Sequence, residues 1–108
     1  MTIPGFPSSP YYAVIFTSRL KQDARGYAEM AERMDALAKT MPGYLGIESA
    51  RNGDGFGITV SYWDSEQAIS NWKKNIEHLE AQRQGRAEWY QDYTVRITKV
   101  ERAYELQK

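Results

Sequence analysis

The order in which the hydrophobic period changes along this sequence constrains its fold more than any other feature. Apolar, β-branched and aromatic runs predict strands over residues 11–18, 44–49, 57–63 and 93–100. Apolar residues spaced three and four apart predict helices over 23–41 and 64–85. The resulting order is strand, helix, strand, strand, helix, strand. It predicts a ferredoxin-like α+β fold with a split β-α-β arrangement, in which two helices cover one face of a four-stranded antiparallel sheet.

Local signals indicate where these elements begin and end. Met41-Pro42-Gly43 is expected to end the first helix, and Arg51–Gly55 has the composition of a hairpin turn. Asp64 is the expected N-cap of the second helix, with Gln67 completing a capping box. The tail to Leu106 is a candidate extension of the last strand.

The length and the charge balance exclude several classes of protein. The 108 residues suit one domain, expected over 11–108, preceded by an extended arm over 1–10 that is rich in Pro, Ser and Gly. The 14 basic and 14 acidic residues cancel, so nucleic-acid binding through a basic patch is not expected. The uncharged N-terminal run is broken by three prolines and predicts neither a membrane span nor a signal peptide.

The scarcity of cysteine and histidine limits the available chemistry. The chain has no cysteine, which excludes disulfides and thiol catalysis and fits a cytoplasmic location. With one histidine, a metal site built within one chain is not expected.

Aromatic and apolar residues are too numerous to be hidden easily in one small core. Aromatic residues make up 13% of the chain, and eight of them are tyrosines. The sheet face away from the helices is expected to be apolar and covered by a second copy, so that a homodimer forms through the sheets. The residues assigned to that face are Tyr12, Val14, Phe16, Ile58, Val60 and Tyr62.

The second predicted helix carries the clearest candidate site. Its apolar stripe contains Trp72, and one edge carries Asn71, Asn75, His78 and Gln82 at spacings of four, three and four. Solvated helix edges usually carry Glu and Lys, so amides and an imidazole in one line favour a cavity instead.

Several motifs together resemble the antibiotic biosynthesis monooxygenase (ABM) domain family of the dimeric α+β barrel superfamily. They are Met41 to Gly46, the strand-to-helix junction Ser61 to Ala68, Trp72, His78 to Ala81, Gly85-Arg86 and Val100 to Tyr104. The resemblance covers almost everything from Tyr11 to Leu106. It implies a dimeric α+β barrel and, among the activities of the family, oxygenation of a small-molecule substrate without a cofactor.

Heme-degrading members of this family provide a more specific comparison. They use an asparagine on the first strand, a tryptophan on the second helix and a histidine ten residues later as the iron ligand. Here Ser18 stands at the asparagine position, Trp72 at the tryptophan position and Gln82 at the histidine position. Because glutamine is a poor heme ligand compared with imidazole, heme degradation is the least favoured of the family activities.

Each candidate residue has a functional and a structural interpretation. His78 is a candidate general base for a phenolic or hydroquinone proton, or a helix-edge histidine that contacts solvent or a nearby carboxylate. Trp72 is a candidate wall for a flat aromatic substrate, or a core residue. Asn75 and Gln82 either bind a carbonyl or hydroxyl of a ligand or satisfy backbone groups. Arg86 either pairs with an anionic substrate or forms a structural salt bridge.

The sequence therefore predicts a monooxygenase-like enzyme with no cofactor and no metal, acting on a small aromatic or quinol-type substrate between the second helix and the sheet. His78 and Trp72 are the predicted catalytic residues, and Asn75, Gln82, Arg86 and Ser18 are the predicted substrate-binding residues. The alternative is a non-catalytic, dimeric protein that binds a small ligand or is associated with stress.

Overall fold

The chain folds into six regular elements in the order that the hydrophobic periods predict. The computed structural model describes residues 10–82 and 89–106, and within the second helix it describes the side chains only as far as residue 77. The elements are β1 (Tyr11–Leu20), α1 (Tyr27–Thr40), β2 (Tyr44–Arg51), β3 (Phe56–Trp63), α2 (Glu66–Gln82) and β4 (Tyr90–Val100).

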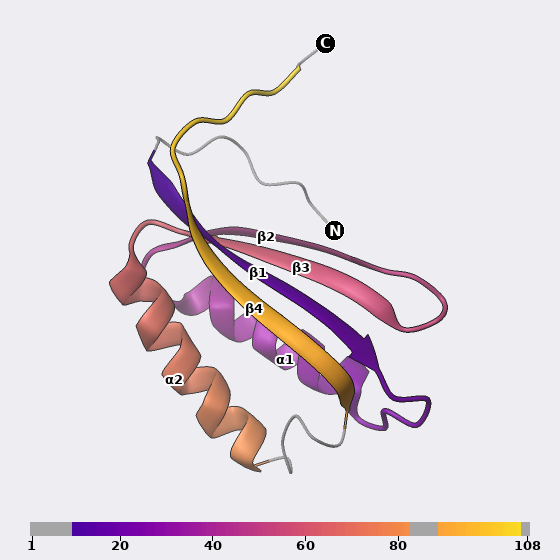
Figure 1. The fold of residues 1–108 in the computed structure, drawn as a ribbon. Helices are drawn as coiled ribbons and strands as arrows, with labels where there is room; N and C mark the ends of the chain where they lie inside the picture. Colours follow the sequence, from indigo (N-terminus) through magenta and orange to yellow (C-terminus); the bar gives the residue numbers. More distant parts are fainter. Residues whose placement is uncertain (1–9, 83–88, 107–108) are drawn as a thin grey trace.

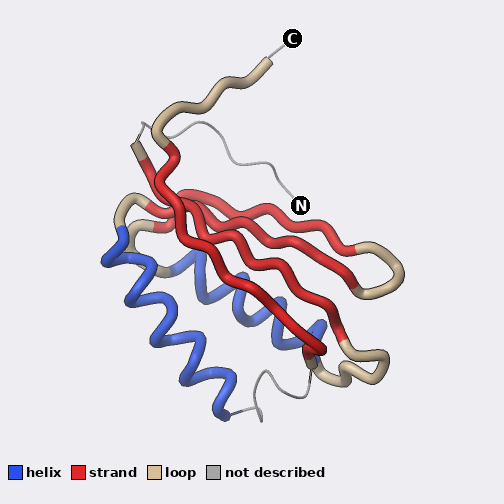
Figure 2. The backbone as a smooth tube through the Cα atoms, in the orientation of Figure 1, coloured by secondary structure: helices blue, strands red, loops and turns tan. Residues whose placement is uncertain are grey.

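The four strands form one antiparallel sheet in the order β2-β3-β1-β4. Both helices lie on the same face of this sheet (Figure 1), and Figure 2 shows the two layers, helices below and strands above. The prediction of a ferredoxin-like α+β fold is confirmed. β4 begins three residues earlier than predicted because its pairing with β1 continues to Leu20 and Tyr90. The tail over 101–106 does not extend it.

The strand register decides which side chains face the helices. Val14 packs in a buried cluster with Ala38 of α1 and Ile69 of α2, so its side chain lies on the helix-facing side. Residues directly opposite each other in an antiparallel pair share a face, and faces alternate along each strand. The helix-facing side of the sheet therefore consists of these residues, strand by strand: Tyr12, Val14, Phe16 and Ser18 of β1; Gly57, Thr59, Ser61 and Trp63 of β3; Tyr44, Ile47, Ser49 and Arg51 of β2; Tyr93, Val95, Ile97 and Lys99 of β4.

Three residues were predicted on the sheet face away from the helices, and the register shows that this assignment is wrong. Tyr12, Val14 and Phe16 face the helices instead, because Val14 and its neighbours of the same parity pack into the core. On the open face, the side chains of β3 are apolar or aromatic, such as Ile58, whereas those of the edge strand β4 are mostly polar, such as Arg96. The open face is therefore less apolar than the sequence suggested.

Two clusters of buried residues lie between the sheet and the helices. The first consists of Val14, Ala38, Trp63, Ala68 and Ile69, with Tyr12, Met41, Tyr44 and Trp72 packed against it. The second consists of Met30, Trp89 and Tyr90, with Phe16, Leu20, Ala24, Tyr27 and Met34 packed against it. Neither cluster includes the helix-facing residues of β4 from 93 to 99.

The start of α2 differs from the prediction by one residue. The backbone N–H of Ala68 donates to the Ser65 hydroxyl at 3.1 Å, so Ser65 rather than Asp64 caps the helix. Gln67 does not form a capping box, and its amide donates to Asn71 at 3.0 Å. Asp64 lies against Gly43, where a β-carbon would come within 2.5 Å of the Asp64 carboxylate.

Neither α1 nor the described part of α2 is long and apolar enough to cross a membrane.

Candidate functional site

The helix-facing side of β4 carries apolar side chains that the helices do not cover. Tyr93, Val95 and Ile97 are directly opposite Ser18, Phe16 and Val14 of β1, which places them on the same side as the core. Their exposed fractions are nevertheless 41%, 47% and 52%. We call these three residues the β4 stripe. Apolar side chains on the covered side of a sheet are normally buried, so the stripe is a candidate surface for a ligand.

Aromatic rings border the β4 stripe at one end. The ring of Phe16 lies edge-on to Tyr93 and to Tyr90, with both centroid distances at 5.4 Å. Tyr90 and Tyr93 also meet edge-on, at 5.8 Å. Such pairs fix the ring planes, so Tyr93 presents a defined surface beside Val95.

Trp72 of α2 lies at the other side of the same region. It packs against the cluster that contains Val14, the residue opposite Ile97, and its ring centroid is 4.9 Å from that of Trp63. This contact with the core is what its structural interpretation expects. The side chain remains only half-buried, which is compatible with the wall of a ligand site as well.

The three tryptophans differ in whether their indole N–H groups have acceptors. Trp63 donates to the Ser61 hydroxyl at 2.9 Å, and Trp89 donates to the Arg25 carbonyl at 2.9 Å. The Trp72 N–H is buried and has no acceptor in the part of the chain that the structure describes. A buried donor without a partner costs about 1–3 kcal/mol, so an acceptor that reached the Trp72 N–H would recover this cost.

At the opposite end of the sheet, Ser18 takes part in a polar network rather than lining an open surface. Its side chain is buried, and its hydroxyl accepts from Arg51 at 2.8 Å. The same guanidinium donates to the Tyr27 hydroxyl at 3.1 Å and to the carbonyl of Gly55. Arg51 reaches β1 across Gly57, where a β-carbon would lie 2.6 Å from the guanidinium carbon.

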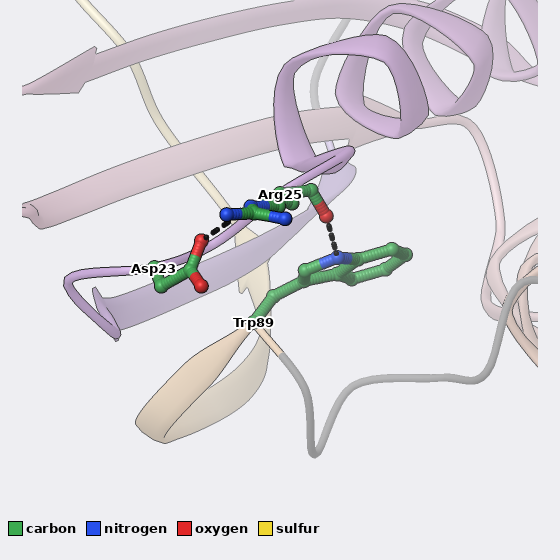
Figure 3. A network of polar contacts seen from close by, with 3 residues as sticks. All are labelled: Asp23, Arg25 and Trp89. Atoms are coloured by element: carbon green, nitrogen blue, oxygen red, sulfur yellow. Dashed lines mark hydrogen bonds and ion pairs between the residues drawn. The ribbon is translucent and has the colours of Figure 1, made fainter.

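Trp89 packs at the same end of the sheet. Its N–H binds the Arg25 carbonyl, and the Arg25 guanidinium pairs with Asp23 at 3.2 Å (Figure 3). The ring of Tyr27 meets Trp89 edge-on at 6.3 Å. Polar and aromatic contacts therefore fill the end of the sheet around Ser18.

The predicted polar edge of α2 is only partly visible in the structure. Asn71 and Asn75 are exposed, and the Asn75 amide donates to the Asn71 carbonyl at 2.9 Å. The backbone of His78 and Gln82 belongs to α2, but their side chains lie outside the description, and Arg86 lies outside the described residues altogether. The roles of all six predicted site residues stay predictions. Ser18 and Trp72 are not brought together, since each packs in a different region.

Two tyrosines have raised pKa values, and neither is a candidate base. Burial, followed by the nearby carboxylate of Asp35, raises the pKa of Tyr44. Burial also raises the pKa of Tyr62, and the hydrogen bond that its hydroxyl donates to Glu48 at 2.6 Å raises it further. Both phenols are thereby held in the protonated form. Tyr62 lies on the open face, away from the β4 stripe.

The described residues contain no group of three His, Cys, Asp or Glu side chains that could bind a metal ion.

Neither the exposure of the β4 stripe nor the contact of Arg51 with Ser18 is predicted by the sequence. The alternation of Tyr93, Val95 and Ile97 is visible in the sequence, but alternation predicts burial of the apolar side. Whether helices cover that side depends on tertiary packing. The contact of Arg51 with Ser18 joins residues 33 positions apart and has no local signal.

The chain is similar to known proteins in sequence. The model of a family described as "Antibiotic biosynthesis monooxygenase" matches residues 11–84. The chain is 54% identical over 96 residues to the uncharacterized protein YqjZ of Bacillus subtilis, covering 89% of this chain and 84% of YqjZ.

Solved structures with the same fold are much more distant in sequence. The cofactor-independent oxygenase SnoaB from Streptomyces nogalater superposes with a TM-score of 0.65 at 12% identity, covering 93% of this chain and 100% of SnoaB. Rv0793 from Mycobacterium tuberculosis superposes with a TM-score of 0.66 at 19% identity, covering 92% of this chain and 100% of Rv0793. At these identities the likeness concerns the fold alone.

Proposed function

Because this chain belongs to the antibiotic biosynthesis monooxygenase family, we propose that it oxygenates a small aromatic or quinol-type molecule without a cofactor. The observation that carries this proposal is the β4 stripe, with Trp72 on the facing helix. Apolar surface on the helix-facing side of the sheet suits a flat ring, and the half-buried side chain of Trp72 adds aromatic surface. The cofactor-independent oxygenase SnoaB shares the fold and makes the reaction class plausible.

The proposed chemistry needs one base and a substrate that is easily oxidised. His78 takes the proton of a phenol, and the resulting electron-rich ring anion reacts with O₂. A C–O bond forms at a free ring carbon, the O–O bond then breaks, and one oxygen atom leaves as water. A phenol and O₂ thereby give a quinone and water. All four electrons that reduce O₂ come from the substrate.

Oxygen consumption tests this proposal directly. A panel of phenols and hydroquinones is supplied to the protein, and O₂ uptake is followed with an electrode against uptake without protein. We expect uptake that saturates with substrate and falls at least tenfold in His78→Gln, since general base catalysis typically contributes 10²–10⁴-fold. Lys74→Gln is the matched control, because Lys74 is an exposed residue of the same helix.

Each outcome separates this proposal from its alternatives. Equal rates in the wild type and His78→Gln contradict His78 as the base. Absence of uptake with every substrate, together with tight binding of some of them, favours the non-catalytic binding protein. A sharp Soret band on addition of hemin revives the heme hypothesis.

A homodimer through the open sheet faces belongs to the same proposal. Phe56 and Ile58 on that face are 39% and 41% exposed, which supports a covered face despite its polar neighbours. Sedimentation of the wild type at micromolar concentration tests it. A monomer at that concentration contradicts pairing through the sheets.

A further inference from the structure

The charges on the helix-facing side of the sheet are all of one sign. Of the side chains that the register places on that side, Arg51 of β2 and Lys99 of β4 are the charged ones. No carboxylate occurs among them. The two cations lie at opposite ends of the sheet and on opposite edge strands, because Arg51 is level with Ser18 whereas Lys99 is level with Tyr12.

The two cations differ in what surrounds them. The Arg51 guanidinium is engaged by Ser18, Gly55 and Tyr27, so its donors are already in use. Lys99 is exposed, and in the described part of the chain no hydrogen bond or ion pair involves its ammonium group. Its ammonium group is therefore the cation that remains available on this side of the sheet.

Lys99 continues the β4 stripe. It follows Ile97 at the next helix-facing position, about 7 Å further along the strand. The long apolar stem of a lysine can lie along the stripe while its ammonium group stays in water. A molecule that covers Val95 and Ile97 with a ring system thus meets one positive charge at the end of the ring.

The beginning of α2 also lies near this end, but it adds no net positive charge. Trp63 lies on the other side of Tyr12 from Lys99, and α2 begins within three residues of Trp63. The N-terminus of a helix favours negative charge, but Asp64 and Glu66 already supply it here, so Lys99 is the cation on which the argument depends.

We propose that the ligand of the β4 stripe is an aromatic acid, whose ring lies on Val95 and Ile97 and whose acid group pairs with Lys99. This inference rests on the proposed function for the location of the ligand and adds its chemical class. Lys99 is a specificity-determining residue and takes no part in the chemical step.

Binding of two matched probes tests this assignment. 2-Naphthoate and 2-naphthamide share the ring system and differ in charge, and their dissociation constants are measured by titration calorimetry at low salt. We expect naphthoate to bind roughly fivefold more tightly to the wild type, the size typical of a partly exposed ion pair. Lys99→Gln should bring the ratio to about one.

Arg96→Gln is the matched control. Arg96 is also an exposed cation of β4, but it pairs with Ile15 and therefore lies on the open face. This variant removes the same net charge and should keep the wild-type ratio. Added salt should reduce the ratio in the wild type and leave it unchanged in Lys99→Gln.

Three results overturn the inference: binding of neither probe, equal binding of both to the wild type, or a preference for naphthoate that survives Lys99→Gln. The calorimetric result is independent of oxygen uptake. A Lys99-dependent preference without uptake supports the aromatic acid and contradicts the oxygenase. Uptake without that preference supports the oxygenase and contradicts the aromatic acid.

Discussion

The two ends of the helix-facing side of the sheet differ in packing. At one end polar groups have hydrogen-bond partners, and at the other apolar side chains are exposed to solvent. Around Ser18, the Arg51 guanidinium and the Trp89 indole each have acceptors, and α1 supplies Tyr27 over them. Along Val95 and Ile97, apolar side chains are about half exposed. The first end is thus filled by the side chains of the chain itself, whereas the second leaves apolar side chains exposed on the helix-facing side of the sheet.

Replacing a large side chain at each end should give the greatest contrast. Trp89→Ala removes a ring that is 3% exposed and should lower the free energy of unfolding by about 3–5 kcal/mol. Val95→Ala, at 47% exposed, should change it by less than about 0.5 kcal/mol. Urea unfolding monitored by circular dichroism measures both. A comparable loss in the two variants would mean that Val95 is buried in solution, for example by a second copy.

The Arg51 side chain passes over Gly57 to reach Ser18, and this contact can be tested separately. Gly57→Ala places a methyl group 2.6 Å from the guanidinium carbon and should cost about 1–3 kcal/mol. Gly53→Ala is the matched control, because nothing lies within 4 Å of a β-carbon there. Its unfolding midpoint in urea should stay close to that of the wild type. Equal midpoints for the two variants would show that Arg51 does not cross Gly57.

The smallest effect is expected for exchanging tryptophan for phenylalanine. Trp72→Phe removes a buried N–H that has no described acceptor, so stability should stay within about 1 kcal/mol of the wild type and can rise. Trp89→Phe leaves the Arg25 carbonyl without its donor and should cost about 1–2 kcal/mol. Chemical denaturation of the two variants under the same conditions measures both changes in the free energy of unfolding. A larger loss of unfolding free energy for Trp72→Phe would indicate that the Trp72 N–H does have an acceptor in solution.

The order of elements could be predicted from the sequence because helical and strand periods extend over many residues and do not depend on distant partners. Which side chains of β1 face the helices could not be predicted. Residues 11–16 are apolar or aromatic at every position, so the run has no alternation, and only pairing with β3 and packing of Val14 on Ala38 select the face.

The candidate site was predictable to a smaller extent. Trp72 could be placed beside the core because it lies within the apolar stripe of α2. The hydrogen bond of Ser18 to Arg51 and the exposure of Ile97 both arise from tertiary packing, which brings distant residues together in one case and leaves a strand uncovered in the other. Ser65 was missed as the N-cap because Asp64 and Ser65 are both favourable caps in sequence.

The bridge from Arg51 to Ser18 also bears on how the sheet assembles. The guanidinium reaches β1 only where β3 presents a glycine, and sliding β2 along β3 by two residues would put Thr59 in its path. A slipped hairpin would keep most of its backbone hydrogen bonds but would leave this cation without its partners on β1. The arrangement thus penalises a misaligned pairing of β2 with β3.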